Sequence, residues 1–252
     1  MSTEADSSLD GSRVELEEML EIYDLSGSNR GFMSRENYYS MIQAEFQADG
    51  KITTQVKGVR LMLLHTDGCI YVQRRSTKKR VNPGLYDKAV GGHVTAKDDH
   101  HPDPVMGDFD VAMSKESNGE IGVKIRIVAP EDYVAELKKA DLETEAVCMA
   151  IDTISPWKVE RIIVDPILGP NPVSIIQPWM NRFYIGYYDG GIQFKDGEAQ
   201  GIQLYKPHDL ADELRLIPKK FTADIADMYN RFSEFFMPLE VCISRHEQGG
   251  RK

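Results

Sequence analysis

The residues best suited to chemistry lie on one predicted helix, residues 109–121. Phe109 and Ala112 belong to its apolar side, and the i, i+3, i+4, i+7, i+11 spacing continues that side through Glu116 and Glu120. Carboxylates four residues apart repel each other, and inward-facing carboxylates are costly unless a cation or a donor binds them. Such oxygen ligands suit Mg²⁺ or Mn²⁺, which typically bridge carboxylates to substrate phosphates. The alternative is a slightly rotated helix whose two glutamates face solvent.

A dense basic run, residues 74–80, stands out in an acidic chain of formal charge -10. Arg74, Arg75 and Lys79 are its candidate phosphate ligands, because arginine offers forked donors and lysine a compact point charge. The alternative is a solvated surface loop without a binding function. The glycine-rich segment that follows favours the functional interpretation.

That segment contains Gly91 and Gly92, followed by His93. A backbone without side chains lets a ligand or a metal approach a main-chain carbonyl. A lone histidine is more often simply hydrogen-bonded. The acidic and histidine-rich string at residues 98–103 is expected to be an exposed loop, because adjacent loop residues rarely converge on one metal.

Composition narrows the classes of protein that fit. With 252 residues and 41% hydrophobic content, the chain predicts one main domain. A formal charge of -10 opposes general nucleic-acid binding. The three cysteines are far apart, which indicates neither disulfides nor zinc. No apolar run approaches the roughly 20 residues that span a bilayer, so we expect a cytoplasmic protein without membrane contact.

The elements that position these residues alternate between strands and helices. Residues 59–75 predict a β-hairpin turning at Gly68, and Gly122 is placed to close the helix that carries the glutamates. Further strands are expected at 124–128, 182–188 and 201–205, and further helices at 133–139, 207–214 and 223–236. Strands wrapped by helices predict an α/β sandwich.

The expected organisation has one domain with loose ends. Residues 1–13 are polar and expected to be disordered, residues 14–245 form the domain, and residues 246–252 form a loose tail. Residues 78–93 are expected to be a loop. Residues 129–181, which contain several prolines, are expected to be an insertion.

Together, these motifs resemble the Nudix hydrolase superfamily, in the branch similar to isopentenyl diphosphate isomerase. The approach to the Nudix box is matched by residues 72–76, Lys79, residues 83–87 and residues 91–94. The second half of the box resembles residues 115–123 in degraded form. Lys115 stands where the family has arginine, Ser117 where it has an aliphatic residue, and Gly119 where it has one of two paired glutamates.

The resemblance implies a Nudix-type α/β/α sandwich with a mixed sheet and Mg²⁺- or Mn²⁺-assisted attack of water on a phosphoanhydride. It implies that Glu116 and Glu120 bind the metal, with a carbonyl of Gly91, and that Lys115 orients a glutamate. Arg74, Arg75 and Lys79 would hold the phosphates. The expected substrate is a small diphosphate-containing metabolite, such as a nucleoside diphosphate derivative.

Two alternatives remain open. The lost glutamate at Gly119 favours a Nudix-fold binding or regulatory protein that keeps the pocket without turnover. Prenyl diphosphate isomerisation is disfavoured, since similar isomerases use a cysteine where this chain has Gly91. If the chain associates, a homodimer is expected as the commonest assembly.

Overall fold

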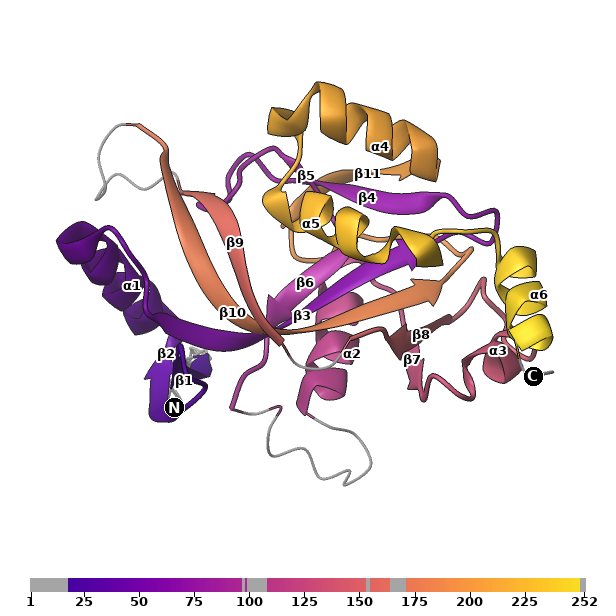
Figure 1. Ribbon diagram of the computed structural model, residues 1–252, viewed down its shortest axis with the longest axis horizontal. Coiled ribbons are helices and arrows are strands. Elements are labelled where there is room, and N and C mark those ends of the chain that lie inside the picture. Colours follow the sequence, from indigo (N-terminus) through magenta and orange to yellow (C-terminus); the bar gives the residue numbers. More distant parts are fainter. Residues whose placement is uncertain (1–17, 97, 99–107, 153–154, 164–170, 250–252) are drawn as a thin grey trace, which may run out of the picture.

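A computed structural model describes residues 18–96, 98, 108–152, 155–163 and 171–249 (Figure 1). The strands are β1 (Met19–Asp24), β2 (Asn29–Ser34), β3 (Thr54–Leu64), β4 (Ile70–Arg75), β5 (Tyr86–Asp87), β6 (Val90–His93), β7 (Ile125–Val128), β8 (Ala146–Ala150), β9 (Ser155–Ile163), β10 (Val173–Tyr187) and β11 (Ala199–Tyr205). The α-helices are α1 (Arg35–Asp49), α2 (Asp108–Glu120), α3 (Tyr133–Leu137), α4 (Pro207–Leu216), α5 (Ala223–Phe232) and α6 (Leu239–Gly249).

The sheet is mixed and organised around β3. Its main path runs β11-β4-β3-β10-β8-β7, with β10 parallel to β3 and β7 parallel to β8. Strand β6 pairs antiparallel with β3, and β9 pairs antiparallel with the first half of β10. The nearly continuous burial of β3 is typical of a strand covered on both faces.

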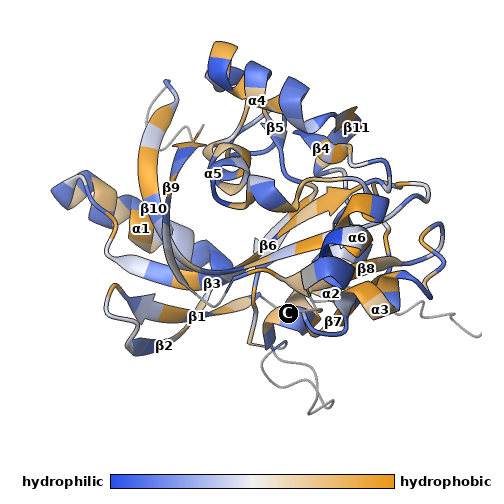
Figure 2. Ribbon diagram, turned by 45° about the vertical axis from the view of Figure 1, so that its right-hand side comes forward, coloured by the Kyte–Doolittle hydropathy of each residue, from blue (hydrophilic) through white to orange (hydrophobic). Residues whose placement is uncertain are grey.

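Helices cover both faces of the sheet (Figure 1). One core packs α5 and α4 against the strands through Ile225, Met228 and Leu210, and the other packs α2 through Phe109 and Met113. The alternating hydrophilic and hydrophobic bands of α4 in Figure 2 show a helix with one apolar side. The expected α/β/α sandwich with a mixed sheet is therefore confirmed.

Most expected elements are present. β3 and β4 form the predicted hairpin, and Gly122 follows α2 with a φ of 70°. One expectation needs correction, because the presumed loop at residues 78–93 contains β5 and β6. The residues presumed to be an insertion, 129–181, contribute β8, β9 and part of β10 to the sheet, and α6 continues to Gly249 in the presumed tail. The expectations for residues 1–13 and 99–103 lie outside the described residues. In the part of the chain that is described, every helix is too short or too polar to cross a bilayer.

Candidate functional site

A pocket of about 740 Å³ opens on the sheet face that α5 covers. Ligand pockets in proteins typically have volumes of about 300–1,000 Å³. The cationic side chains that line it are Arg35, Arg60, Arg75, Lys78, Lys79, Arg80, Lys88 and Arg161. The acidic side chains are Glu18, Glu36, Asp87, Glu198 and Asp224. Cations thus outnumber carboxylates in a chain whose net charge is -10.

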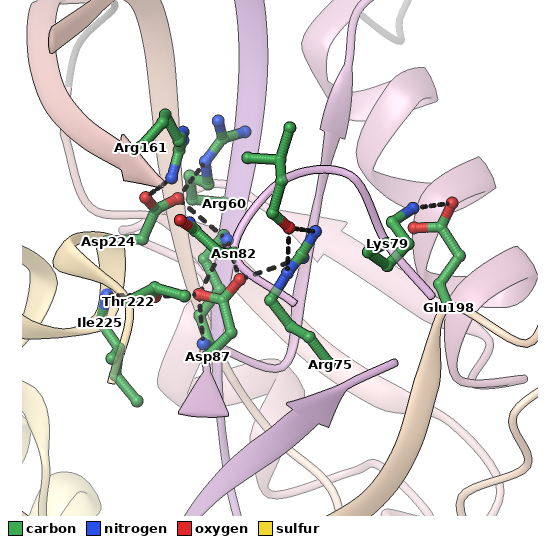
Figure 3. A network of polar contacts seen from close by, with 12 residues as sticks. Arg60, Arg75, Lys79, Asn82, Asp87, Arg161, Glu198, Thr222, Asp224 and Ile225 are labelled. Atoms are coloured by element: carbon green, nitrogen blue, oxygen red, sulfur yellow. Dashed lines mark hydrogen bonds and ion pairs between the residues drawn. The ribbon is translucent and has the colours of Figure 1, made fainter. Parts of the chain in front are cut away.

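Asp224 lies at the floor of this pocket, on the first turn of α5, and is fully buried. Its Oδ2 lies 3.2 Å from Nε of Arg60 on β3 and 3.0 Å from Nζ of Lys88, and its Oδ1 pairs with Nη1 of Arg161 on β9 (Figure 3). Three segments far apart in the sequence therefore meet at one carboxylate.

Asp87 is the second buried carboxylate of the floor. It accepts hydrogen bonds from Lys88 Nζ at 3.1 Å, from Arg75 Nη1 at 3.3 Å and from Thr222 Oγ1 at 2.7 Å. Thr222 also caps α5, because the same Oγ1 accepts the backbone N–H of Ile225. The floor network thus holds four cations, Arg60, Arg75, Lys88 and Arg161, against two carboxylates.

The pKa values reflect this excess of positive charge. Burial, together with the nearby guanidinium groups of Arg60 and Arg161, lowers the pKa of Lys88 to about 7 despite its ion pair with Asp87. Burial lowers the pKa of Arg161 to about 9 and that of Arg60 to about 10. Burial opposes ionisation of Asp87, but Lys88 and Arg75 more than compensate and lower its pKa. An anion in the pocket would neutralise the uncompensated charge.

The predicted phosphate ligands separate into two groups. Arg75 and Lys79 line the pocket, where Arg75 donates to the carbonyl of Val81 at 3.0 Å and Lys79 pairs with Glu198. Arg74 is exposed and does not line the pocket, because successive side chains of β4 point to opposite faces. The expectation that Arg74 holds phosphate is therefore not supported by its placement.

Glu116 of α2 lies against a glycine of β6, and Glu120 is buried four residues further along the helix. A Cβ placed on Gly92 would be 2.3 Å from Cδ of Glu116, so the missing side chain lets the glutamate rest on the strand. Glu120 is 6% exposed, and its Oε2 has no hydrogen-bond partner among the described residues. The predicted inward-facing carboxylates are therefore present, and neither lies among the residues that line the pocket.

Both glutamates are poorly compensated. Burial raises the pKa of Glu116 to about 7, and burial, Glu116 and Glu198 raise that of Glu120 to about 8. The described residues contain no group of three or more His, Cys, Asp or Glu side chains arranged to hold a metal. The orphaned oxygen of Glu120 and the mutual repulsion fit a cation that two glutamates share with other oxygen ligands.

The remaining predicted residues lie near this pair. Gly91 lines the pocket, and a Cβ on it would be 2.4 Å from Cε of Lys88, so this glycine makes room for the floor lysine. The Lys115 side chain is 51% exposed, and its Nζ lies 3.7 Å from Asp98. No hydrogen bond or ion pair joins Lys115 to either glutamate among the described residues, so the structure does not show it orienting one.

Sequence reasoning missed the floor of the pocket. Arg60, Lys88, Arg161 and Asp224 come from four separate segments, and Glu198 was not among the predicted site residues either. One signal was available: Arg60 interrupts an otherwise apolar run, and a buried charge is rare unless it is paired. The pattern singles out Arg60 as a candidate but does not identify its partners.

Comparisons with known proteins give distant structural likenesses. No protein-family model and no curated protein sequence matches the chain. Solved structures that resemble it include DR0079 from Deinococcus radiodurans, at 16% identity and a TM-score of 0.49, covering 85% of this chain and 98% of that one. A MutT protein from Methanosarcina mazei has 14% identity and a TM-score of 0.40 over 71% and 92% of the two chains. An Ap4A hydrolase from C. elegans has 13% identity and a TM-score of 0.37 over 71% and 96%. At these values the likenesses assign no activity to this chain.

Proposed function

We propose that this protein is a Nudix-type hydrolase that cleaves a phosphoanhydride bond in a small diphosphate-containing molecule with the help of Mg²⁺ or Mn²⁺. The observation that carries the proposal is a pocket with excess buried positive charge beside two poorly compensated carboxylates. A diphosphate is attracted by the first feature, and a divalent cation by the second.

The proposed division of work follows from where the side chains lie. Lys79 and Arg75 bind phosphate oxygens, since both side chains line the pocket. Glu116 and Glu120 hold the cation, which supplies charge neutralisation at phosphorus and a more acidic water when bound. Glu198 is assigned as the acceptor of the water proton because it lines the pocket and is ionised, since Lys79 lowers its pKa against the effect of burial.

The reaction is a displacement at phosphorus. The oxygen of water forms a bond to one phosphorus of the anhydride, and the bond from that phosphorus to the bridging oxygen breaks. The bridging oxygen leaves with the electron pair on the other phosphate, and the water proton passes to Glu198. The products are two separate phosphate groups, and the pocket's cations stabilise the negative charge that develops on both.

A second candidate is a binding protein that retains the pocket without turnover. The observation that favours it is Gly119, an exposed residue where the resembling family has a glutamate, so that the last turns of α2 offer only Glu116 and Glu120 to a cation. Isomerisation of a prenyl diphosphate has less support, because no cysteine is among the residues known to line the pocket.

The test measures release of phosphate or pyrophosphate from nucleotide sugars, dinucleotides, nucleoside triphosphates and prenyl diphosphates, with Mg²⁺, with Mn²⁺ and with chelator. Glu116→Gln should abolish metal-dependent release and spare ligand binding, whereas the exposed Glu131→Gln should change neither. Unchanged release in Glu116→Gln would refute the site assignment. Thermal stabilisation by one of these ligands without any release would favour the binding protein.

A further inference from the structure

The floor of the pocket has hydrogen-bond donors that its own carboxylates do not use. Arg161 donates through Nη1 to Asp224, and Arg60 donates through Nε to Asp224 and through Nη1 to the carbonyls of Val59 and Gly92. Nη2 of Arg60 and both Nε and Nη2 of Arg161 therefore have no partner among the described residues. Both arginines line the pocket.

These guanidinium groups are held in place by aromatic rings. The Cζ of Arg60 lies 4.5 Å from the ring centre of Trp179, and that of Arg161 lies 5.9 Å from Trp157 and 5.7 Å from Trp179. Arg60 and Arg161 are only 3% and 6% exposed. Charge-assisted hydrogen bonds are stronger in such surroundings than in water, and fixed guanidinium planes lose little entropy on binding.

The Arg161 side of the floor is separate from the part of the pocket assigned to the anhydride. In Figure 3 the Arg161–Asp224 pair and the Lys79–Glu198 pair lie on opposite sides of Arg75. Arg60 borders the α2 glutamates, because its Nη1 donates to the carbonyl of Gly92, on which Glu116 rests. A diphosphate held by Arg75 and Lys79 next to these glutamates therefore leaves the donors of Arg161 for another group of the same ligand.

We infer that the floor arginines Arg60 and Arg161, with Lys88, bind a second phosphate of the substrate, a phosphate monoester distinct from the anhydride. Without Arg75, which is assigned to the anhydride, three floor cations still face two carboxylates, so the floor keeps positive charge for an anion to neutralise. A phosphate monoester carries about -1.5 to -2 near neutral pH and has three acceptor oxygens, which suits the free arginine donors. This inference rests on the proposed function for the location of the anhydride.

The test uses ligand pairs that differ by one phosphate monoester: NADPH against NADH, and coenzyme A against its 3′-dephospho form. Binding is measured by calorimetry with chelator present, so that no turnover is needed. The wild-type protein should bind the phosphorylated member of each pair at least about ten-fold more tightly. Equal affinity within both pairs, or no binding of any of the four ligands, would overturn the inference.

Variants of Arg161 then test whether the floor causes the preference for the phosphorylated ligand. Arg161→Gln should reduce it to about three-fold or less, and Arg161→Lys should retain part of it, because lysine keeps the charge but loses the fork. The matched control is Arg215→Gln, on an exposed arginine of α4, which should keep the full preference. If Arg161→Gln does not fold, Arg161→Lys and the wild-type pairs still decide the matter; a full preference in folded Arg161→Gln contradicts the assignment.

The outcomes also separate this inference from the proposed hydrolysis. A preference for the phosphorylated ligands without metal-dependent release supports the floor site and refutes the hydrolase. Metal-dependent release of phosphate with equal kcat/KM from the two members of each ligand pair supports the hydrolase and refutes the floor site.

Discussion

Replacing Glu120 by glutamine should stabilise the metal-free protein near neutral pH. Glu120 is 6% exposed, its Oε2 has no hydrogen-bond partner among the described residues, and its pKa is raised to about 8 by burial and by Glu116. Glutamine has nearly the same size but cannot ionise. The variant therefore avoids the cost of holding a charged carboxylate inside the protein.

The size of the effect follows from linkage between protonation and folding. Below the ordinary pKa of 4.5, Glu120 is protonated in both the folded and the unfolded state and costs nothing. As pH rises towards the folded pKa of about 8, the unfolded state releases its proton first, so the free energy of unfolding falls. Each pH unit in that window corresponds to about 1.4 kcal/mol, so the loss by about pH 8 is on the order of 4 kcal/mol.

Urea unfolding at several pH values between about 5 and 8, with chelator, measures this loss directly. Glu120→Gln should be the more stable protein at the upper end and should show a shallower decline, whereas the exposed Glu131→Gln should behave as the wild type. Added Mg²⁺ should stabilise the wild type more than Glu120→Gln. A variant that is less stable at about pH 8, or declines as steeply as the wild type, would refute the reasoning.

Three further predictions concern the walls of the site. Gly92→Ala places a Cβ 2.3 Å from Cδ of Glu116, so it should cost about 1–3 kcal/mol in urea unfolding and reduce metal-dependent turnover; wild-type values for both would contradict the close packing. Thr222→Ala removes a helix cap and a hydrogen bond to Asp87, and should lower the free energy of unfolding by about 1–3 kcal/mol. Arg74→Gln should leave the affinity for the calorimetry ligands within about two-fold of the wild-type value, because exposed charges outside the pocket contribute little. A larger loss of affinity would show that Arg74 takes part in binding.

Local patterns were sufficient to predict the elements that carry the α2 glutamates. Helical spacing placed Glu116 and Glu120 on the apolar side of α2, and Gly122 ended the helix as expected. The two glycines of β6 were misread as loop residues, because glycine is usually a strand breaker. In the structure they permit close packing, of Glu116 over Gly92 and of Lys88 over Gly91.

The floor of the pocket was beyond sequence reasoning because it depends on long-range pairing. Asp224 meets Arg60 across 164 positions and Arg161 across 63. Neither separation has a periodicity that sequence inspection detects. The parallel pairing of β10 with β3, and the return of β9 along β10, bring these arginines together, and a sheet register of that kind is set by tertiary packing.

The contrast between an acidic chain and a cationic pocket floor has a consequence for binding kinetics. At long range the net charge of -10 repels an approaching polyanion, and dissolved salt weakens that repulsion. Contacts with Arg60, Lys88 and Arg161 form inside the protein, where salt screens them far less. Higher ionic strength should therefore accelerate association while leaving the residence time of the bound ligand nearly constant, the reverse of the behaviour of a protein whose whole surface attracts its ligand.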